Sequence, residues 1–214
     1  MAKRGLWAAA MAAMAAAAAG ASRPSVTVAA SEIAAPCVRA AARGWTGSAG
    51  LCVGRRCGAQ ADVVVLSAVE MNRALESGQA VDGSDLDVAR VPWVLAVRGD
   101  SPEIRSLSDL ARGEHDVRVL GGPAAYEARR ALEGMDVARV RETTDERELS
   151  SAAVALVPLS LARGARQVAV DVPPVVVRAA VSASSRRPDA AAAFVRFLGS
   201  DAGQRAFAAC GVTQ

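Results

Sequence analysis

Short apolar runs rich in valine recur along the chain, and most of them are followed by a turn and a segment with helical periodicity. Such runs are typical of strands buried on both faces of a sheet. They occupy residues 25–30, 61–66, 90–97, 117–120, 152–157, 168–172 and 175–181. The segments of helical character are 32–43, 69–76, 106–111, 124–133, 189–198 and a last one that begins at Ser200. This alternation predicts an α/β fold with mostly parallel sheets flanked by helices.

The composition is that of a globular protein without a surface suited to nucleic acid. Of 214 residues, 52% are hydrophobic and 22% are charged, which is enough apolar side chain to build a core. Lys3 is the only lysine, and the arginines are scattered among a nearly equal number of carboxylates, for a formal net charge of +3. A nucleic-acid partner needs a basic patch, so none is expected.

The N-terminal segment has the pattern of a secretory signal peptide. Lys3 and Arg4 precede an uncharged run over 6–19, which ends in the small residues 19–21. We expect cleavage after Ala21 and export to the periplasm. A membrane anchor is the alternative, but the run is shorter than the ~20 residues that a spanning helix needs.

Four cysteines follow this segment, at positions 37, 52, 57 and 210. Oxidising compartments favour disulfides, and four cysteines allow three pairings, among which the sequence does not choose. A bond between Cys52 and Cys57 would close a small loop, and Cys37 with Cys210 would then tie the start of the fold to its end. A metal site built from all four thiolates is the alternative. No Cys-x-x-Cys pair is present, so no metal is expected.

The inventory of reactive side chains predicts that the protein is not an enzyme and has no cofactor. The single histidine, His115, lies in a polar stretch, and there is no Gly-x-Ser-x-Gly motif to supply a partner nucleophile. The lysine of a phosphate-binding loop and the Gly-x-Gly-x-x-Gly pattern are also missing. What remains are serines and glycines where strands meet helices, which can hold an anion through hydroxyl and backbone N–H groups.

Four stretches of the sequence, read in order, resemble the periplasmic molybdate-binding proteins, which are type II solute-binding components of ABC importers. Residues 26–31 resemble that family's opening strand with its ligand-binding serine, and 47–63 resemble its second serine loop and the strand after it. Residues 94–111 resemble the crossover strand and the short Ser-Leu-x-Asp-Leu helix. The stretch 192–204 is similar to the C-terminal Ala-Phe-x-x-Phe-Leu-x-Ser-x-x-Gly-Gln signature.

The resemblance implies a two-lobe fold that closes on a ligand. The signal peptide is expected over 1–21, the first part of lobe I over 22–92 and lobe II over 93–173. Lobe I is completed by its return and C-terminal helices over 174–214.

The resemblance also implies that small oxyanions are held by neutral donors. It assigns Ser31 and Ser48 as hydroxyl and backbone donors of lobe I, and Ala124, Ala125 and Tyr126 as the candidates in lobe II. Where the family has a ligand-binding tyrosine this chain has Pro158, so Tyr126, the sole tyrosine, is the candidate replacement. The alternative for Tyr126 is that it packs against the lobe surface.

The function implied by the resemblance is capture of molybdate or tungstate by a monomer that delivers it to an ABC permease. The alternative is a shortened relative that binds no oxyanion and acts as a sensor or interaction module.

Overall fold

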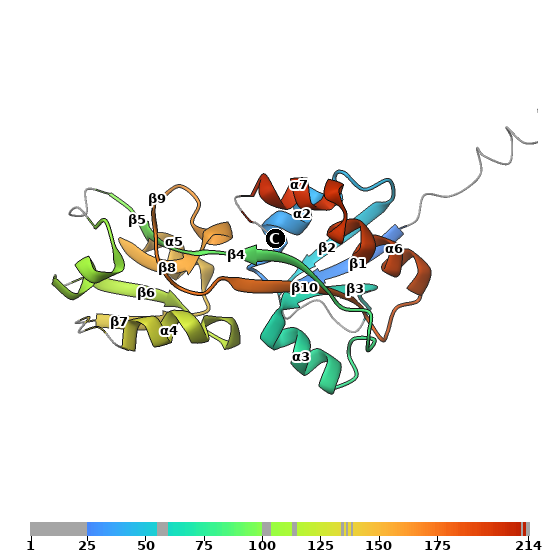
Figure 1. Ribbon diagram of the computed structural model, residues 1–214, viewed down its shortest axis with the longest axis horizontal. Helices are drawn as coiled ribbons and strands as arrows, with labels where there is room; N and C mark the ends of the chain where they lie inside the picture. Colours follow the sequence, from blue (N-terminus) through green and yellow to red (C-terminus); the bar gives the residue numbers. More distant parts are fainter. Residues whose placement is uncertain are drawn as a thin grey trace, which may run out of the picture.

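The chain folds into two lobes, each built on one five-stranded sheet (Figure 1). The computed structural model describes residues 25–54, 60–99, 104–112, 115–133, 135, 137, 139–210 and 212, so the signal-peptide segment and Cys57 lie outside the described residues. The strands of lobe I are β1 (Ser25–Ala30), β2 (Ser48–Val53), β3 (Val63–Ser67), β4 (Leu86–Val91) and β10 (Val175–Val181). The strands of lobe II are β5 (Trp93–Val97), β6 (Asp116–Leu120), β7 (Arg139–Thr143), β8 (Val154–Pro158) and β9 (Arg166–Ala169).

Each sheet has a single strand that runs against the other four. The strand orders are β2-β1-β3-β10-β4 and β7-β6-β8-β5-β9. In lobe I, β10 is antiparallel to both of its neighbours, and β5 holds the same position in lobe II. The prediction of mostly parallel sheets flanked by helices is confirmed, and the one reversed strand of each sheet is the strand that arrives from the other lobe.

The chain crosses between the lobes twice, from β4 into β5 and from β9 into β10 (Figure 1). The sequence predicted one strand over 90–97, but Pro92 divides it. Proline has no N–H to give to a ladder, so the chain leaves one sheet at Val91 and enters the other at Trp93. The Pro92 carbonyl accepts a hydrogen bond from the Leu159 N–H at 2.8 Å, which fixes the crossing against lobe II.

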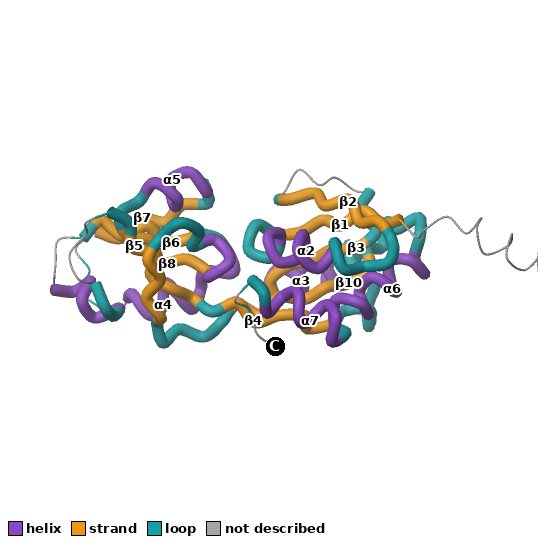
Figure 2. Tube along the Cα trace, turned by 90° about the horizontal axis from the view of Figure 1, so that it is seen from above, coloured by secondary structure: helices purple, strands orange, loops and turns teal. Residues whose placement is uncertain are grey.

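The helices pack on both sides of the sheets (Figure 2). They are α2 (Ala35–Ala42), α3 (Ala68–Glu76), α4 (Tyr126–Glu133), α5 (Glu146–Ser151), α6 (Pro188–Gly199) and α7 (Asp201–Ala208). Short 3-10 helices are η1 (Leu107–Arg112), η2 (Pro123–Ala125) and η3 (Leu159–Leu161). Helix α2 begins later than the predicted position 32, because residues 32–34 form a turn and Pro36 occupies the first helical turn.

Two strands and one α-helix have no counterpart in the sequence prediction: β2, β7 and α5. The strand β2 contains Gly50 and was expected to be a loop with Ser48. The strand β7 carries charged side chains and is mostly exposed. Both strands lie at the edge of a sheet, where one side is open to solvent and the apolar pattern of a buried strand is not required.

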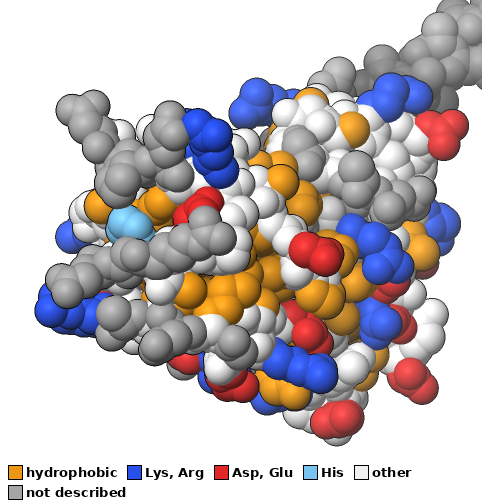
Figure 3. Space-filling model, turned by 60° about the vertical axis from the view of Figure 1, so that its left-hand side comes forward, with side chains coloured by type: hydrophobic (Ala, Val, Ile, Leu, Met, Phe, Trp, Pro, Cys, Tyr) orange, Lys and Arg blue, Asp and Glu red, His pale blue; other side chains and the backbone are white. Residues whose placement is uncertain are grey.

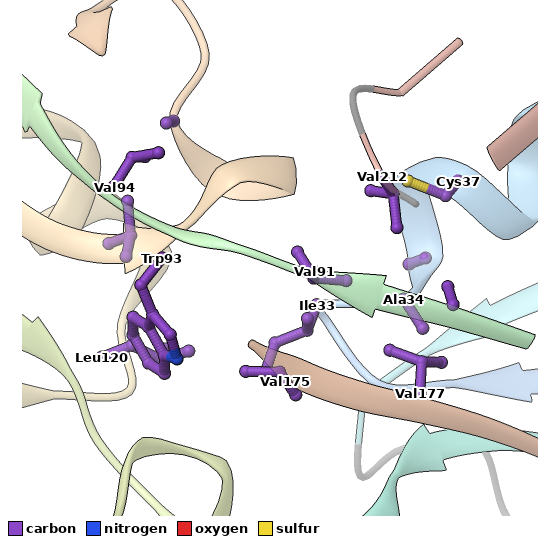
Figure 4. Close-up of a cluster of buried hydrophobic side chains, with 14 of the residues drawn as sticks. Ile33, Ala34, Cys37, Val91, Trp93, Val94, Leu120, Val175, Val177 and Val212 are labelled. Atoms are coloured by element: carbon purple, nitrogen blue, oxygen red, sulfur yellow. The ribbon is translucent and has the colours of Figure 1, made fainter. Parts of the chain in front are cut away.

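A single cluster of buried apolar side chains runs through both lobes. It includes Val28 of β1, Trp93 at the crossing and Val119 of β6, all at most 1% exposed. Figure 4 shows where the lobes meet, with Val91, Trp93 and Val175 from the crossing strands. The lobes are therefore held together by shared packing as well as by their connections.

No helix in the described part of the chain is long and apolar enough to cross a membrane.

The C-terminal stretch that resembled a family signature has a structural role. The Gln204 side chain donates to the carbonyl oxygens of Val88 and Leu198, at 2.9 and 3.0 Å, which joins α7 to β4 and α6. Gly203 allows the close turn between α6 and α7, because a Cβ there would overlap the carbonyl oxygens of Phe197 and Leu198.

Gly203→Ala is therefore expected to lower the free energy of unfolding by about 1–3 kcal/mol, as overpacking of a close backbone contact does. Urea unfolding followed by circular dichroism measures the loss. Gly44→Ala is the matched control, since the nearest atom to its new Cβ would be at an ordinary 3.5 Å. Equal stabilities for the two variants would contradict this role of Gly203.

Candidate functional site

A cavity of about 500 Å³ lies between the two lobes. We call it the interlobe cavity. Its lobe I wall is formed by the turn after β1, the first half of α2 and the end of β2, and its lobe II wall by α5 and η3. Its lining residues are Glu32, Ala35, Pro36, Arg39, Val53, Glu146, Arg147, Leu149, Ser150, Ser160, Leu161 and Arg163. The carboxyl ends of parallel strands from both lobes meet here, which is where α/β sheets bind ligands.

Five of the lining side chains are charged, and arginines outnumber carboxylates. Arg39 comes from α2, Arg147 from α5 and Arg163 from the turn after η3, whereas the carboxylates are Glu32 and Glu146. All five are exposed, so the cavity opens to solvent. Elsewhere, on the face drawn in Figure 3, side chains of both signs surround a central group of hydrophobic ones. The excess of arginine favours an anion at the interlobe cavity.

Ser31 follows β1 at the edge of lobe I that faces lobe II. Its Oγ is buried and has no hydrogen-bond partner among the described residues. Its N–H donates to the Val65 carbonyl at 2.9 Å, and its carbonyl accepts from the N–H groups of Ala34 and Ala35. The Ser31 N–H is thus bonded to β3, and the Ser31 hydroxyl is the group without a partner among the described residues.

Ser48 does not lie with Ser31. It is the first residue of β2, and the parallel register places it beside Ser25, whereas Ala30, the neighbour of Ser31, lies beside Val53. A strand rises about 3.3 Å per residue, so the two serines are separated by most of the length of the sheet. The structure therefore does not bring Ser31 and Ser48 together; the residues beside Ser31 at the edge are Val53 and Gly54.

The lobe II candidates lie in η2 and at the start of α4, directly after β6 ends. Ala125 is fully buried and donates its N–H to the Gly122 carbonyl at 3.1 Å. Ala124 is partly buried, and Tyr126 is 57% exposed. The segment η2 contacts α3 of lobe I, so it lies at the interface between lobes. The structure brings Ala124 and Ala125 to the lobe boundary and leaves the Tyr126 side chain mainly in solvent.

The N-terminus of α3 also lies at the lobe boundary, but its own side chains occupy it. Ser67 and Glu70 form a capping box, in which the Ser67 hydroxyl donates to the Glu70 carboxylate at 2.7 Å. A carboxylate at this helix end already balances the helix dipole.

Trp93 is a candidate that the sequence did not indicate. Its side chain is 1% exposed, and its indole N–H has no hydrogen-bond partner in the described structure. In Figure 4 the indole lies beside Leu120, with its nitrogen on the ring edge that faces Ile33 and Val175 of lobe I. A buried donor without a partner lowers the stability of the fold. A ligand atom that accepts its hydrogen bond would remove this cost, so such a donor is a candidate ligand contact. A tryptophan at the crossing is the only feature of the sequence that could have drawn attention to it.

Ser160 was also not predicted, and it bridges the lobes. Its Oγ donates to the Ile33 carbonyl at 2.8 Å, and both residues are buried. Ile33 belongs to the turn after Ser31, so this bond holds the wall that contains Ser31 against η3 of lobe II. Pro158, two residues earlier, pairs with Trp93 in the sheet.

No group of three or more His, Cys, Asp or Glu side chains that could hold a metal ion occurs among the described residues.

Comparison with known proteins identifies the family and the fold. The sequence profile of a family described as "Bacterial extracellular solute-binding protein" matches residues 4–213. A search of curated proteins finds no significant match. The chain is structurally similar to the periplasmic molybdate-binding protein of Azotobacter vinelandii, with a TM-score of 0.74 at 13% identity, over 88% of this chain and 99% of that one.

Two further solved structures have other ligands in their names. The sulfate-binding protein SubI from Mycobacterium tuberculosis H37Rv matches with a TM-score of 0.69 at 18% identity, over 88% of this chain and 86% of that one. Iron-bound HitA from Pseudomonas aeruginosa matches with a TM-score of 0.57 at 19% identity, over 86% and 84%. At such identities the likeness shows the periplasmic binding protein fold and leaves the ligand open.

Ser160→Ala is expected to lower the free energy of unfolding by about 1–3 kcal/mol, because it leaves the buried Ile33 carbonyl without a donor. Urea unfolding measures the change. Ser150→Ala is the control, since its hydroxyl bonds to the Arg147 carbonyl on an exposed helix. If the control loses as much stability as Ser160→Ala, the hydrogen bond between Ser160 and Ile33 contributes no more to the free energy of unfolding than an exposed one does.

Proposed function

Because the chain belongs to the bacterial extracellular solute-binding protein family, which is non-enzymatic and serves ABC transport outside the cytoplasm, we propose that it captures a small oxyanion of the molybdate or tungstate kind. The anion is held between the two lobes, and the loaded monomer delivers it to the permease of an ABC importer in the membrane. The proposed compartment is the periplasm, reached through an N-terminal signal peptide.

The observation that carries the proposal is a pair of buried side-chain atoms without partners, Ser31 Oγ and Trp93 Nε1; the third such atom among the described residues, Arg129 Nε, belongs to α4. One follows β1 of lobe I, and the other begins β5 of lobe II. An indole N–H can only donate, so the ligand atom that satisfies it must be an acceptor. An oxyanion presents several acceptors at once and can take donors from both lobes.

The charges of the interlobe cavity support an anion over a cation. Arg39, Arg147 and Arg163 line a space of about 500 Å³ together with two carboxylates, Glu32 and Glu146. The arginines would attract an anion to the cavity, and Ser31 and Trp93, which are buried and are not among its lining residues, would bind the anion deeper between the lobes after its water is removed. The likeness to proteins named for molybdate and sulfate agrees with this class of ligand.

A second candidate function is a binding module that takes no oxyanion and acts as a sensor or interaction protein. It is favoured by the backbone donors that the fold itself uses: the N–H of Ser31 bonds to Val65 and that of Ala125 to Gly122. Pro158 offers neither an N–H nor a hydroxyl. On this reading the two unpaired groups are a cost of the fold and have no ligand.

Isothermal titration of the mature protein with molybdate, tungstate and sulfate distinguishes the two candidates. We expect saturable binding of molybdate or tungstate at one site per chain. No heat with any of the three anions, on protein shown to be folded by circular dichroism, would exclude this ligand class and favour the second candidate.

Ser31→Ala and Trp93→Phe are each expected to weaken the binding of that anion roughly tenfold or more, since a hydrogen bond to a charged group contributes about 1.5–3 kcal/mol. Ser48→Ala is the matched control and is expected to bind like the unaltered protein, because Ser48 lies at the far end of β2. Binding lost in Ser48→Ala but kept in Ser31→Ala would place the ligand elsewhere.

A further inference from the structure

Two free thiols meet where the first helix of lobe I packs on the last one. Cys37 lies in α2 and Cys210 directly after α7, and these helices are in contact. Pro36, the neighbour of Cys37, and Cys210 line the same cavity, and Cys210 is one of the groups that raise the pKa of the Cys37 thiol. In Figure 4 the Cys37 sulfur is directed toward Val212, two residues beyond Cys210. The structure thus places next to each other two cysteines that are 173 positions apart in the sequence.

Two observations indicate that the cysteines of this protein meet oxidising conditions. Cys52 is disulfide-bonded, and the family is extracellular, where disulfides form and persist. The other two described cysteines, Cys37 and Cys210, are free thiols, one in α2 and one shortly after α7, and these two helices pack together. We propose that Cys37 and Cys210 form a disulfide in the exported protein, which joins α2 to the segment that follows α7.

The bond forms by two thiol–disulfide exchanges with the disulfide of a protein oxidant. The Cys210 thiolate attacks that disulfide, forms a mixed disulfide and releases one oxidant sulfur, which takes up a proton. The Cys37 thiolate then attacks Cys210 Sγ and releases the second oxidant sulfur. Two protein thiols become one disulfide, and the disulfide of the oxidant becomes two thiols, so electrons and protons balance.

The exposure of the two sulfurs sets the order of these steps. Cys37 is 1% exposed, whereas Cys210 is partly exposed and lines a second cavity between the lobes, of about 440 Å³. Burial raises the pKa of the Cys37 thiol, a hydrogen bond to Cys210 raises it further, and the Arg163 guanidinium opposes this rise. The thiolate is the attacking species, so the partly exposed Cys210 attacks the oxidant first and the buried Cys37 attacks Cys210 second.

The bond would stabilise the wall of the interlobe cavity that α2 supplies. Cys37 directly follows Pro36, which lines both cavities, and precedes Arg39 on the same helix. A cross-link at this point fixes the first turn of α2 against the end of the chain. The inference depends on export and not on the identity of the solute, so it stands or falls separately from the proposed oxyanion.

The test uses the full mature protein purified after export. It is denatured and alkylated with iodoacetamide without reductant, then digested with trypsin. Cleavage after Arg39 and Arg205 puts Cys37 and Cys210 in separate peptides, and Cys52 falls in a third. We expect the peptide ending at Arg39 to be linked to residues 206–214. Both peptides recovered as alkylated thiols, or either one linked to the Cys52 peptide, would overturn the proposal.

Thermal unfolding provides a second, independent measurement. We expect a reductant to lower the Tm of the unaltered protein by about 5 °C or more beyond the loss seen in Cys210→Ser, because the cross-link closes most of the chain into one loop. Any contribution of the Cys52 disulfide is the same in both proteins and cancels. Equal losses in the two proteins would overturn the proposal even if Cys210→Ser is itself less stable.

Discussion

The apolar contact at the crossing of the two lobes is the interaction on which the rest of the structure depends. Val91 and Val175 reach it from lobe I, and Trp93 reaches it from lobe II, within one buried cluster that continues into both sheets. Water is excluded there, so a polar group that is left over has no solvent to bond to. The indole N–H of Trp93 and the hydroxyl of Ser31 are such groups, because they are buried without a hydrogen-bond partner among the described residues.

The interior strands of the sheets could be predicted from the sequence because their burial requires a short apolar run. The runs at 25–30 and 175–181 coincide with β1 and β10. The edge strands β2 and β7 escaped prediction because one side of each meets solvent and the sequence there carries glycine or charge. The break at Pro92 shows that a proline inside an apolar run can divide it between two sheets.

The candidate site was only partly predictable. The position of Ser31 followed from a strand that ends at a serine before a helix, which is a local pattern. Ser48 was placed in a loop by resemblance, whereas register with β1 decides its position, and register depends on contacts that are distant in sequence. The same holds for Trp93 and for the bond between Ser160 and Ile33, residues that are far apart in the chain.

The matching strand order of the two sheets determines which residues of the two lobes occupy equivalent positions. Strand by strand, β1, β2, β3 and β4 correspond to β6, β7, β8 and β9, and each lobe receives its reversed strand from the other. Ser31, which follows β1, therefore has Gly121, which follows β6, as its counterpart. The two lobes are thus arranged like the subunits of a two-fold dimer that have exchanged one strand, except that both are parts of one chain. Since nothing requires the two halves to keep the same residues, lobe I carries a serine where lobe II carries a glycine, and the symmetric frame has unlike groups at equivalent positions.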